Sequence, residues 1–179
     1  MVSRFVAPGP AVRAPFAAIL LTGCVLSLGA CASLDSGPSS AAFAESSAPA
    51  AVSGYDWFLN TDADQASLAY GLKDSDDVRL GLECQRGAGR VELSAEAAKG
   101  VREIYLESGG DTDRFAAQGE PSELHDGDFL TAAAKTDAPI FQRFRRVGWL
   151  AKWQGDRREM YAAHAESLPA IDRFFSFCG

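Results

Sequence analysis

The sequence predicts an α+β fold: a small antiparallel β-sheet or curled sandwich with a short internal helix and a C-terminal helix. Two observations indicate this fold class. Apolar and polar residues alternate from Val78 to Cys84, which is the two-residue period of a strand with one buried face. Helical patterns come later, at 137–148 and 166–178. Strands that precede separate helices are typical of α+β domains, and we expect the last helix to close the sheet.

Turn residues divide the first half of the folded region into strands. A strand over 66–72 is followed by the polar turn 73–77, whose Asp and Ser side chains hydrogen-bond readily to their own backbone. The alternating strand from Val78 ends at 86–90, where glycines supply the positive φ of a hairpin turn. Val91 resumes the alternation, so we expect a β-hairpin here.

Shorter strand patterns follow in the second half of the region. Gly109 and Gly110 interrupt the chain between the first two of them, and the polar segment 119–128 predicts an irregular loop. A hairpin is expected near the end, with its turn at Gly155 and Asp156. The strands expected here are 102–108, 114–118, 129–135, 149–153 and 159–163.

Capping residues mark both helices. Asp137 and Pro139 predict the start of the first helix, with Asp137 as its N-cap, and Gly148 predicts its end. The second helix has Pro169 in its first turn. Each helix carries one apolar face, as expected for packing on a sheet. The faces comprise Ile140, Phe141, Phe144 and Val147 in the first helix, and Leu168, Ile171, Phe175 and Cys178 in the second.

The N-terminus has the layout of a secretory signal peptide. Arg4 and Arg13 precede an apolar stretch at 15–30, and no acidic residue occurs before Asp35. The stretch is shorter than the roughly 20 residues that a helix needs to span a bilayer. We therefore expect residues 1–30 to be removed as a signal peptide.

Small residues lead into a cysteine at the end of this stretch. The segment 28–31, Leu-Gly-Ala-Cys, resembles the lipobox of bacterial lipoproteins. The resemblance implies that Cys31 is acylated and becomes the first residue of the mature chain. Cys24 also follows a lipobox-like segment, but cleavage there would leave an apolar stretch near the low end of the usual range, so Cys31 is favoured. The alternatives are an ordinary signal cut after Ala30 or Ala32 and an uncleaved anchor.

The chain after Cys31 divides into a tether and a folded domain. Residues 31–54 are rich in Ala, Ser, Pro and Gly and predict a flexible tether behind the lipid. Residues 55–179 predict one globular domain. Ala32 stands where an aspartate would favour inner-membrane retention in well-studied lipoproteins. The resemblance therefore implies a cell-envelope location, at the outer membrane and facing the periplasm.

Two cysteines remain for the folded domain. Cys84 and Cys178 both fall on predicted buried faces, and 93 residues lie between them. In an oxidising compartment such a pair usually forms a disulfide. A bridge that closes this loop stabilises the fold by about 4 kcal/mol in the chain-entropy model. We expect it to join the last helix to the sheet, the alternative being two free buried thiols.

Composition excludes several classes of function. The formal net charge of -7 argues against a nucleic-acid partner, which needs a basic face. Two histidines are too few to suggest a zinc site, and we expect neither a metal nor another cofactor. The sequence contains no nucleophile elbow, phosphate loop or dinucleotide fingerprint. His125 and His164 carry the competing hypothesis of a hydrolase, in which either imidazole acts as a base.

Charge is unevenly distributed along the domain. Residues 55–77 contain six aspartates and one lysine, whereas residues 135–158 contain seven basic and two acidic residues. Arginine and tryptophan are enriched at binding hot spots, so the basic segment predicts a partner-binding patch. In the alternative interpretation the tryptophans fill the core and the arginines neutralise the acidic segment. The patch candidates are Arg143, Arg146, Trp149 and Trp153.

The domain also resembles small β-rich periplasmic proteins. Its order of features is similar to an accessory family of type VI secretion systems: an aspartate-containing turn before a strand, and a cysteine that ends the last helix. The similarity spans most of residues 57–178. The family's SP dipeptide is absent from the turn, where Lys73 and Asp74 precede Ser75. The resemblance implies a fold and an envelope location.

These observations predict a non-enzymatic, envelope-anchored lipoprotein. Its membrane contact is the lipid, and its folded domain is expected to bind a protein partner or a cell-wall component. Besides the hydrolase, a third hypothesis is an inhibitor of a wall-degrading enzyme, in which the loop 119–128 inserts into a cleft.

Overall fold

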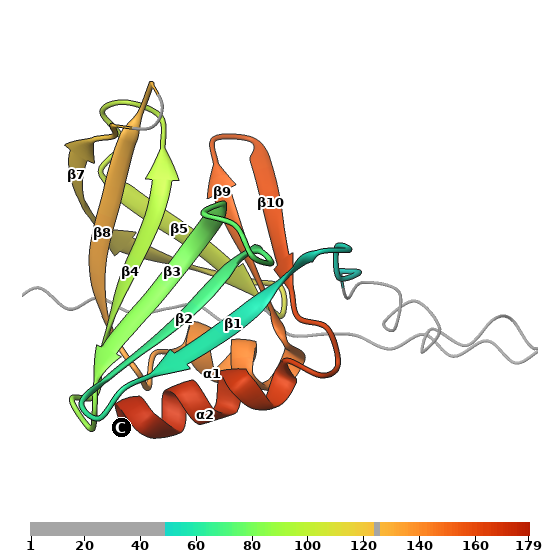
Figure 1. Ribbon diagram of the computed structural model, residues 1–179. Coiled ribbons are helices and arrows are strands. Elements are labelled where there is room, and N and C mark those ends of the chain that lie inside the picture. Colours follow the sequence, from blue (N-terminus) through green and yellow to red (C-terminus); the bar gives the residue numbers. More distant parts are fainter. Residues whose placement is uncertain (1–48, 124–125) are drawn as a thin grey trace, which may run out of the picture. The chain divides into compact units, whose positions relative to one another are not determined.

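Two antiparallel sheets form the frame of the computed structural model, which describes residues 49–123 and 126–179 (Figure 1). Sheet A has the strand order β1-β2-β3-β4-β8-β7, and sheet B has the order β10-β9-β5-β6. Together with two helices they confirm the α+β class. The strands are β1 (Tyr55–Thr61), β2 (Gln65–Leu72), β3 (Val78–Gln85), β4 (Arg90–Ala97), β5 (Glu103–Ser108), β6 (Asp111–Ala116), β7 (Gln118–Pro121), β8 (Asp128–Lys135), β9 (Trp149–Gln154) and β10 (Arg157–Ala162); the helices are α1 (Pro139–Val147) and α2 (Leu168–Cys178).

Most predicted strands and turns are confirmed. The strand β1 was not predicted, and the prediction for 119–128 is wrong. The hairpin turn between β3 and β4 contains Gly87 and Gly89, with φ of 65° and 63°. The segment 119–128, expected to be irregular, contains β7, which pairs with β8 from Gln118↔Thr131 to Pro121↔Asp128. Because β7 is a short, mostly exposed edge strand, it shows no apolar alternation that a sequence pattern could reveal.

Both helices end near the predicted residues, but two details differ. Ala138 is the N-cap of α1, not Asp137, and no side chain caps that end. Gly148 ends α1 in the left-handed region, as predicted. Val147 and Leu168 were expected in the core and are 39% and 41% exposed, because they stand at the helix ends, beyond the turns that pack on the sheets.

Aromatic side chains fill the interior at the end where the helices lie. Trp57 of β1 contacts Phe144 of α1 with ring centroids 4.8 Å apart. Phe141 and Phe175 link the two helices at 5.2 Å. Tyr161 of β10 completes the layer from the side of sheet B and is fully buried. This end is a conventional close-packed core.

The C-terminus of α2 is fixed to the turn between β3 and β4. The Cys84–Cys178 disulfide joins β3 to the last residue of the helix, with a Cα–Cα distance of 5.7 Å, and confirms the predicted bridge. The amides of Gly87 and Gly89 donate to the carbonyls of Phe177 and Cys178. Backbone carbonyls that every helix leaves unpaired at its C-terminus are thereby satisfied.

The opposite end of the sandwich is less completely paired. Pairing between β3 and β4 stops at Gly81↔Ser94. The start of β3 and the end of β4, which lie beyond this pair, therefore separate. The tip of the β9–β10 hairpin lies at this end, away from α1 and α2 (Figure 1). It is attached to the rest of sheet B by β5, which pairs with β9 over only three residues, Tyr105↔Trp153 to Glu107↔Ala151.

The segment before β1 lies against the outward face of sheet B. Ala51 packs on Trp149, Ala151 and Ala162, and the carbonyl of Val52 accepts from the amide of Tyr55. The last residues of the predicted tether thus belong to the packed unit. Neither helix of the described residues combines the length and the apolar character needed to cross a bilayer.

Candidate functional site

A cavity of about 670 Å³ lies where the two sheets separate, between the upper ends of β4, β5, β8 and β9. It arises because inward-facing side chains of β4 become smaller along the strand. Val91 and Leu93 lie in the close-packed core, whereas Ala95 and Ala97 leave space beside them. We call this cavity the Lys152 cleft. Its apolar wall comprises Ala95, Ala97, Val101, Ile104 and Leu130.

The β9–β10 hairpin supplies the polar side of the cleft. Residues that face each other across the two strands form successive pairs along its inner surface. Leu150 lies opposite Tyr161 in the core, Lys152 opposite Glu159 one step further out, and Gln154 opposite Arg157 at the tip. The inner surface of the hairpin therefore changes from apolar to charged within two residues along each strand, and the change occurs at the cleft.

Lys152 is a buried cation at the centre of this arrangement. Its residue is 6% exposed, and its Nζ donates a hydrogen bond of 3.0 Å to the backbone carbonyl of Glu96. The amide of Gln154 donates to the same carbonyl at 3.1 Å. Because β3 no longer pairs with β4 at this level, two side chains of β9 serve as partners for that carbonyl. These two bonds connect the hairpin to sheet A.

Burial is the largest influence on the Lys152 ammonium. It lowers the pKa of Lys152 below its ordinary value, and the carboxylates of Glu159 and Glu96 offset this only in part. The Nζ of Lys152 lies 3.8 Å from the Oε2 of Glu159, which is too long for a hydrogen bond. The positive charges of Arg157 and Arg79 lower the pKa further. The ammonium is therefore incompletely compensated.

A second, smaller cavity of about 260 Å³ adjoins the cleft on the same face of the hairpin and is bordered by Arg79 and Glu159. Lys152, Gln154 and Arg157 border both cavities, together with the upper end of β4. The Nη2 of Arg157 donates to the Oε1 of Gln154 at 2.8 Å. No carboxylate of the described residues forms an ion pair with Arg157.

The other charged groups at the mouth of the cleft have partners of their own. Arg102 forms an ion pair of 2.7 Å with Asp128, whose side chain is 5% exposed. That carboxylate also accepts from the amide of Gly100, and the two donors lower the pKa of Asp128. Glu103 pairs with Arg114 at 3.0 Å. Of the cations that line the cleft, Arg157 has no ion pair among the described residues, and Lys152 has one with Glu159 at 3.8 Å, beyond hydrogen-bond distance. These are the two cations with donors available to a ligand.

Two buried hydroxyls lie below the cleft. Tyr70 and Tyr161 are in contact, with ring centroids 4.9 Å apart, and among the described residues their oxygens have no partner within hydrogen-bond geometry. Burial raises the pKa of Tyr70 to about 12. It also raises the pKa of Tyr161, with the Glu159 carboxylate as the next contribution. Both tyrosines therefore stay neutral over the physiological range.

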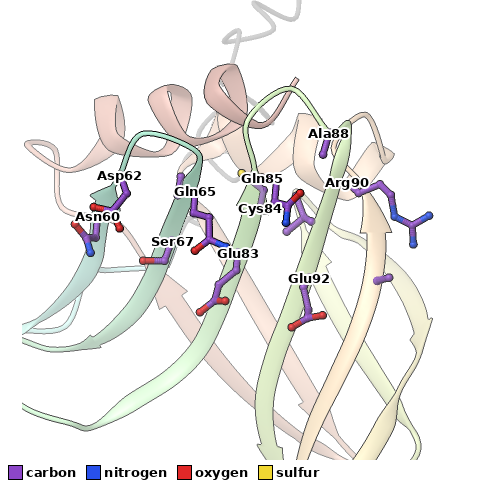
Figure 2. A pocket seen from close by; sticks show the side chains of 13 residues that line it. Asn60, Asp62, Gln65, Ser67, Glu83, Cys84, Gln85, Ala88, Arg90 and Glu92 are labelled. Carbon is purple, nitrogen blue, oxygen red and sulfur yellow. The ribbon is translucent and has the colours of Figure 1, made fainter.

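A groove of about 530 Å³ runs over the outward face of sheet A (Figure 2). Figure 2 shows the Glu83 and Glu92 side chains projecting from neighbouring strands on the same side of the sheet, and these two residues pair directly. Like charges in directly opposed positions weaken a sheet. Asn60, Asp62 and Ser67 add further hydrogen-bonding groups. The groove is polar and open, and it offers no apolar wall like that of the Lys152 cleft.

The structure divides the predicted partner-binding patch. Trp149 and Trp153 lie on the outward face of sheet B, where the Arg158 guanidinium lies 5.5 and 5.8 Å from their ring centroids. Trp149 is buried, and Trp153 donates its indole N–H to Glu107, which also pairs with Arg158. The indole N–H of Trp153 and the guanidinium of Arg158 thus both have Glu107 as their partner on this face.

The two arginine candidates lie on α1. Arg143 donates to the carbonyl of Ser108 and pairs with Asp111 and Asp113 around the β5–β6 turn. Arg146 is exposed. The arginine that the structure joins to the tryptophans is Arg158, which the sequence pattern did not single out.

The surroundings of His164 do not form a catalytic triad. Its backbone amide donates to the Oδ1 of Asp56, and the Ser167 hydroxyl donates to the same oxygen at 2.6 Å. The imidazole Nε2 lies 3.2 Å from the carbonyl of Val52. Asp56 thus holds the turn before α2, and the imidazole contacts neither the hydroxyl nor the carboxylate of this set. His125, Cys24 and Cys31 lie outside the described residues.

Sequence reasoning missed the cleft for two reasons. In the sequence Lys152 belongs to a basic segment, but it alternates in phase with Leu150 on β9 and therefore shares the inward face of Leu150. The decrease in side-chain size from Leu93 to Ala97 was a readable signal that the sheet interior is not filled there. In residues 49–123 and 126–179, no group of three or more His, Cys, Asp or Glu side chains is arranged to hold a metal ion.

Comparison with known protein families, with curated protein sequences and with solved structures finds no match for this chain.

Proposed function

We propose that this chain is an envelope lipoprotein, acylated at Cys31, whose folded domain is a non-enzymatic binding module. Its ligand site is the Lys152 cleft, and the ligand is a component of the cell envelope. Binding sites in proteins are typically concave and mostly apolar, with a few convergent polar groups. The observation that carries the proposal is an apolar cavity of about 670 Å³ with a buried ammonium on its wall.

The disulfide supports the envelope part of the proposal. Structural disulfides persist in secreted and periplasmic proteins and are rare in the cytosol. The Cys84–Cys178 bridge joins two elements distant in sequence, as a structural disulfide does. Palmitate labelling of cells that produce the wild-type chain, Cys31→Ser or Cys24→Ser tests the anchor. We expect the label to be lost in Cys31→Ser alone; loss in Cys24→Ser alone would move the anchor, and label in none of the three would refute it.

Native mass spectrometry of the full chain tests the binding part. The protein is incubated with a lipid extract of bacterial envelopes, and non-covalent adducts are recorded for wild type, Ala97→Phe and Ala133→Phe. Ala97→Phe fills the cleft, whereas Ala133→Phe makes the same change on the outward groove. We expect adducts with wild type and Ala133→Phe and their loss with Ala97→Phe. Adducts with all three proteins, or with none, would refute the cleft as the binding site.

A further inference from the structure

We infer that the ligand of the Lys152 cleft is an aliphatic carboxylate, whose head group contacts Lys152 and Arg157 and whose chain lies between β4, β5 and β8. This inference rests on the proposed function and names the chemical class of its ligand. It follows from the division of the cleft into an apolar wall and a cationic edge.

The apolar wall fits an aliphatic chain. Ala95, Ala97, Ile104 and Leu130 are each less than 10% exposed and come from three different strands of the two sheets. Their side chains offer no hydrogen-bonding groups, so a polar ligand body would lose its hydration there without replacement. An aliphatic chain gains free energy for every methylene group that it buries.

The ammonium of Lys152 has unused hydrogen-bonding capacity. A lysine carries three N–H donors. One of them serves the carbonyl of Glu96 at 3.0 Å, and the Glu159 carboxylate at 3.8 Å lies outside hydrogen-bond distance. A carboxylate that enters the cleft therefore meets a buried cation with free donors, and such charge-assisted hydrogen bonds are stronger than neutral ones.

Arg157 places a second cation beside the first. Its guanidinium has five N–H donors, and the contact with Gln154 uses one of its nitrogens. Arg157 forms no ion pair among the described residues, and it borders the cleft at the hairpin tip. Arg102 at the same mouth is already paired with Asp128. The unpaired Arg157 and the donors that Lys152 does not use thus both lie on the hairpin, opposite the apolar wall.

The pKa of Lys152 supports this charge assignment. The pKa is lowered, although Glu159 and Glu96 act to raise it. The two carboxylates therefore do not compensate for the loss of hydration at the ammonium. An anionic head group would provide the missing compensation, whereas a cationic head group would be repelled.

The test uses dodecanoate with a photoreactive diazirine at its methyl end. The probe is photolysed on the full chain in lipid nanodiscs, and the labelled peptides are mapped by mass spectrometry. We expect the label on residues 95–104 and on Leu130. Unlabelled dodecanoate should compete with the probe, whereas dodecanol and dodecyltrimethylammonium should not. Lys152→Met and Arg157→Gln should each reduce labelling about tenfold. Arg173→Gln, an exposed change on α2, serves as the matched control.

The outcomes separate this inference from the proposed function. If dodecanol competes as well as dodecanoate, and Lys152→Met and Arg157→Gln label like wild type, the carboxylate inference is wrong and the cleft remains a binding site. If a peptide ending in a leucine carboxylate competes better than dodecanoate, the ligand is a chain terminus and the aliphatic class is wrong. If no label falls in the cleft with any variant, both proposals fail. Arg157 is exposed, so its variant stays informative if Lys152→Met does not fold.

Discussion

At one end of the two sheets, α1 and α2 fill the interior with phenylalanine and tryptophan rings, and a disulfide fixes the last helix to β3. At the other end, alanines line β4 and leave a cavity of about 670 Å³ beneath the β9–β10 hairpin. The hairpin is held to sheet A there by two side chains that share one backbone carbonyl.

The difference separates stability from function. The helical end buries large aromatic side chains in contact with one another, so most of the apolar stabilisation of the fold is expected there. The cleft end keeps a buried cation whose desolvation is not fully compensated. An arrangement that costs stability is expected where a ligand will complete it. Substitutions at the two ends should therefore behave in opposite ways.

Loss of an aromatic ring from the helical end should have the largest effect. Phe141 is fully buried and contacts the rings of Phe115 and Phe175. Phe141→Ala should lower the free energy of unfolding by about 3–5 kcal/mol, because the cavity adds to the lost transfer energy. Chemical denaturation of the full chain measures it. Ala97→Phe in the cleft is the control and should cost much less stability. An equal loss in this variant would show that the cleft is as tightly packed as the core.

Removal of the disulfide should rank second. The double variant Cys84→Ala, Cys178→Ala releases α2 from the β3–β4 turn and should lower the free energy of unfolding by about 2–4 kcal/mol. Denaturation of the wild type with and without a reductant gives an independent measure. Ligand binding in the cleft should survive in the folded variant, since the bridge lies at the opposite end. A variant that stays folded but has lost binding would contradict the separation of the two ends.

The ion pair at the mouth of the cleft should make stability depend on acid pH. Arg102 and the amide of Gly100 lower the pKa of Asp128, so this carboxylate stabilises the folded state above its unfolded pKa. That stabilisation is lost as the pH falls through the folded pKa. Asp128→Asn should lower stability at neutral pH and flatten its pH dependence below pH 4. Thermal melts between pH 2 and 7 test this, and an unchanged pH profile in the variant would contradict it.

Removal of the buried charge should have the smallest effect on stability. Lys152→Met keeps the length of the side chain and removes an ammonium whose burial is unfavourable. Gln154 still donates to the carbonyl of Glu96. The free energy of unfolding should change by less than about 1 kcal/mol or rise. A loss of about 3 kcal/mol in the same denaturation assay would mean that Lys152 is retained for the fold.

The sequence revealed the stable end of the molecule better than the cleft. Strong local patterns, such as the alternation from Val78 to Cys84 and the glycine at 148, predicted β3 and the end of α1. The pairing of Cys84 with Cys178 followed from the apolar faces on which they fall. These features depend on residues near in sequence or on only two cysteines.

The cleft depends on where strands stop pairing, which no local pattern encodes. The separation of β3 from β4 above Gly81 exposes the carbonyl that Lys152 binds. The hairpin that reaches this carbonyl is placed by the pairing of β9 with β5, more than 40 residues away in sequence. The composition of the basic segment 135–158 therefore pointed to a surface patch, while the structure turns Lys152 inward.

Hydrogen–deuterium exchange of the full chain, with and without dodecanoate, tests most directly whether the cleft end is the ligand site. We expect slower exchange in 95–104 and 150–158 when dodecanoate is bound, with no change in α1, α2 or the groove strands at 60–67 and 83–92. Slower exchange at the groove strands, or no change at the β9–β10 hairpin, would contradict it.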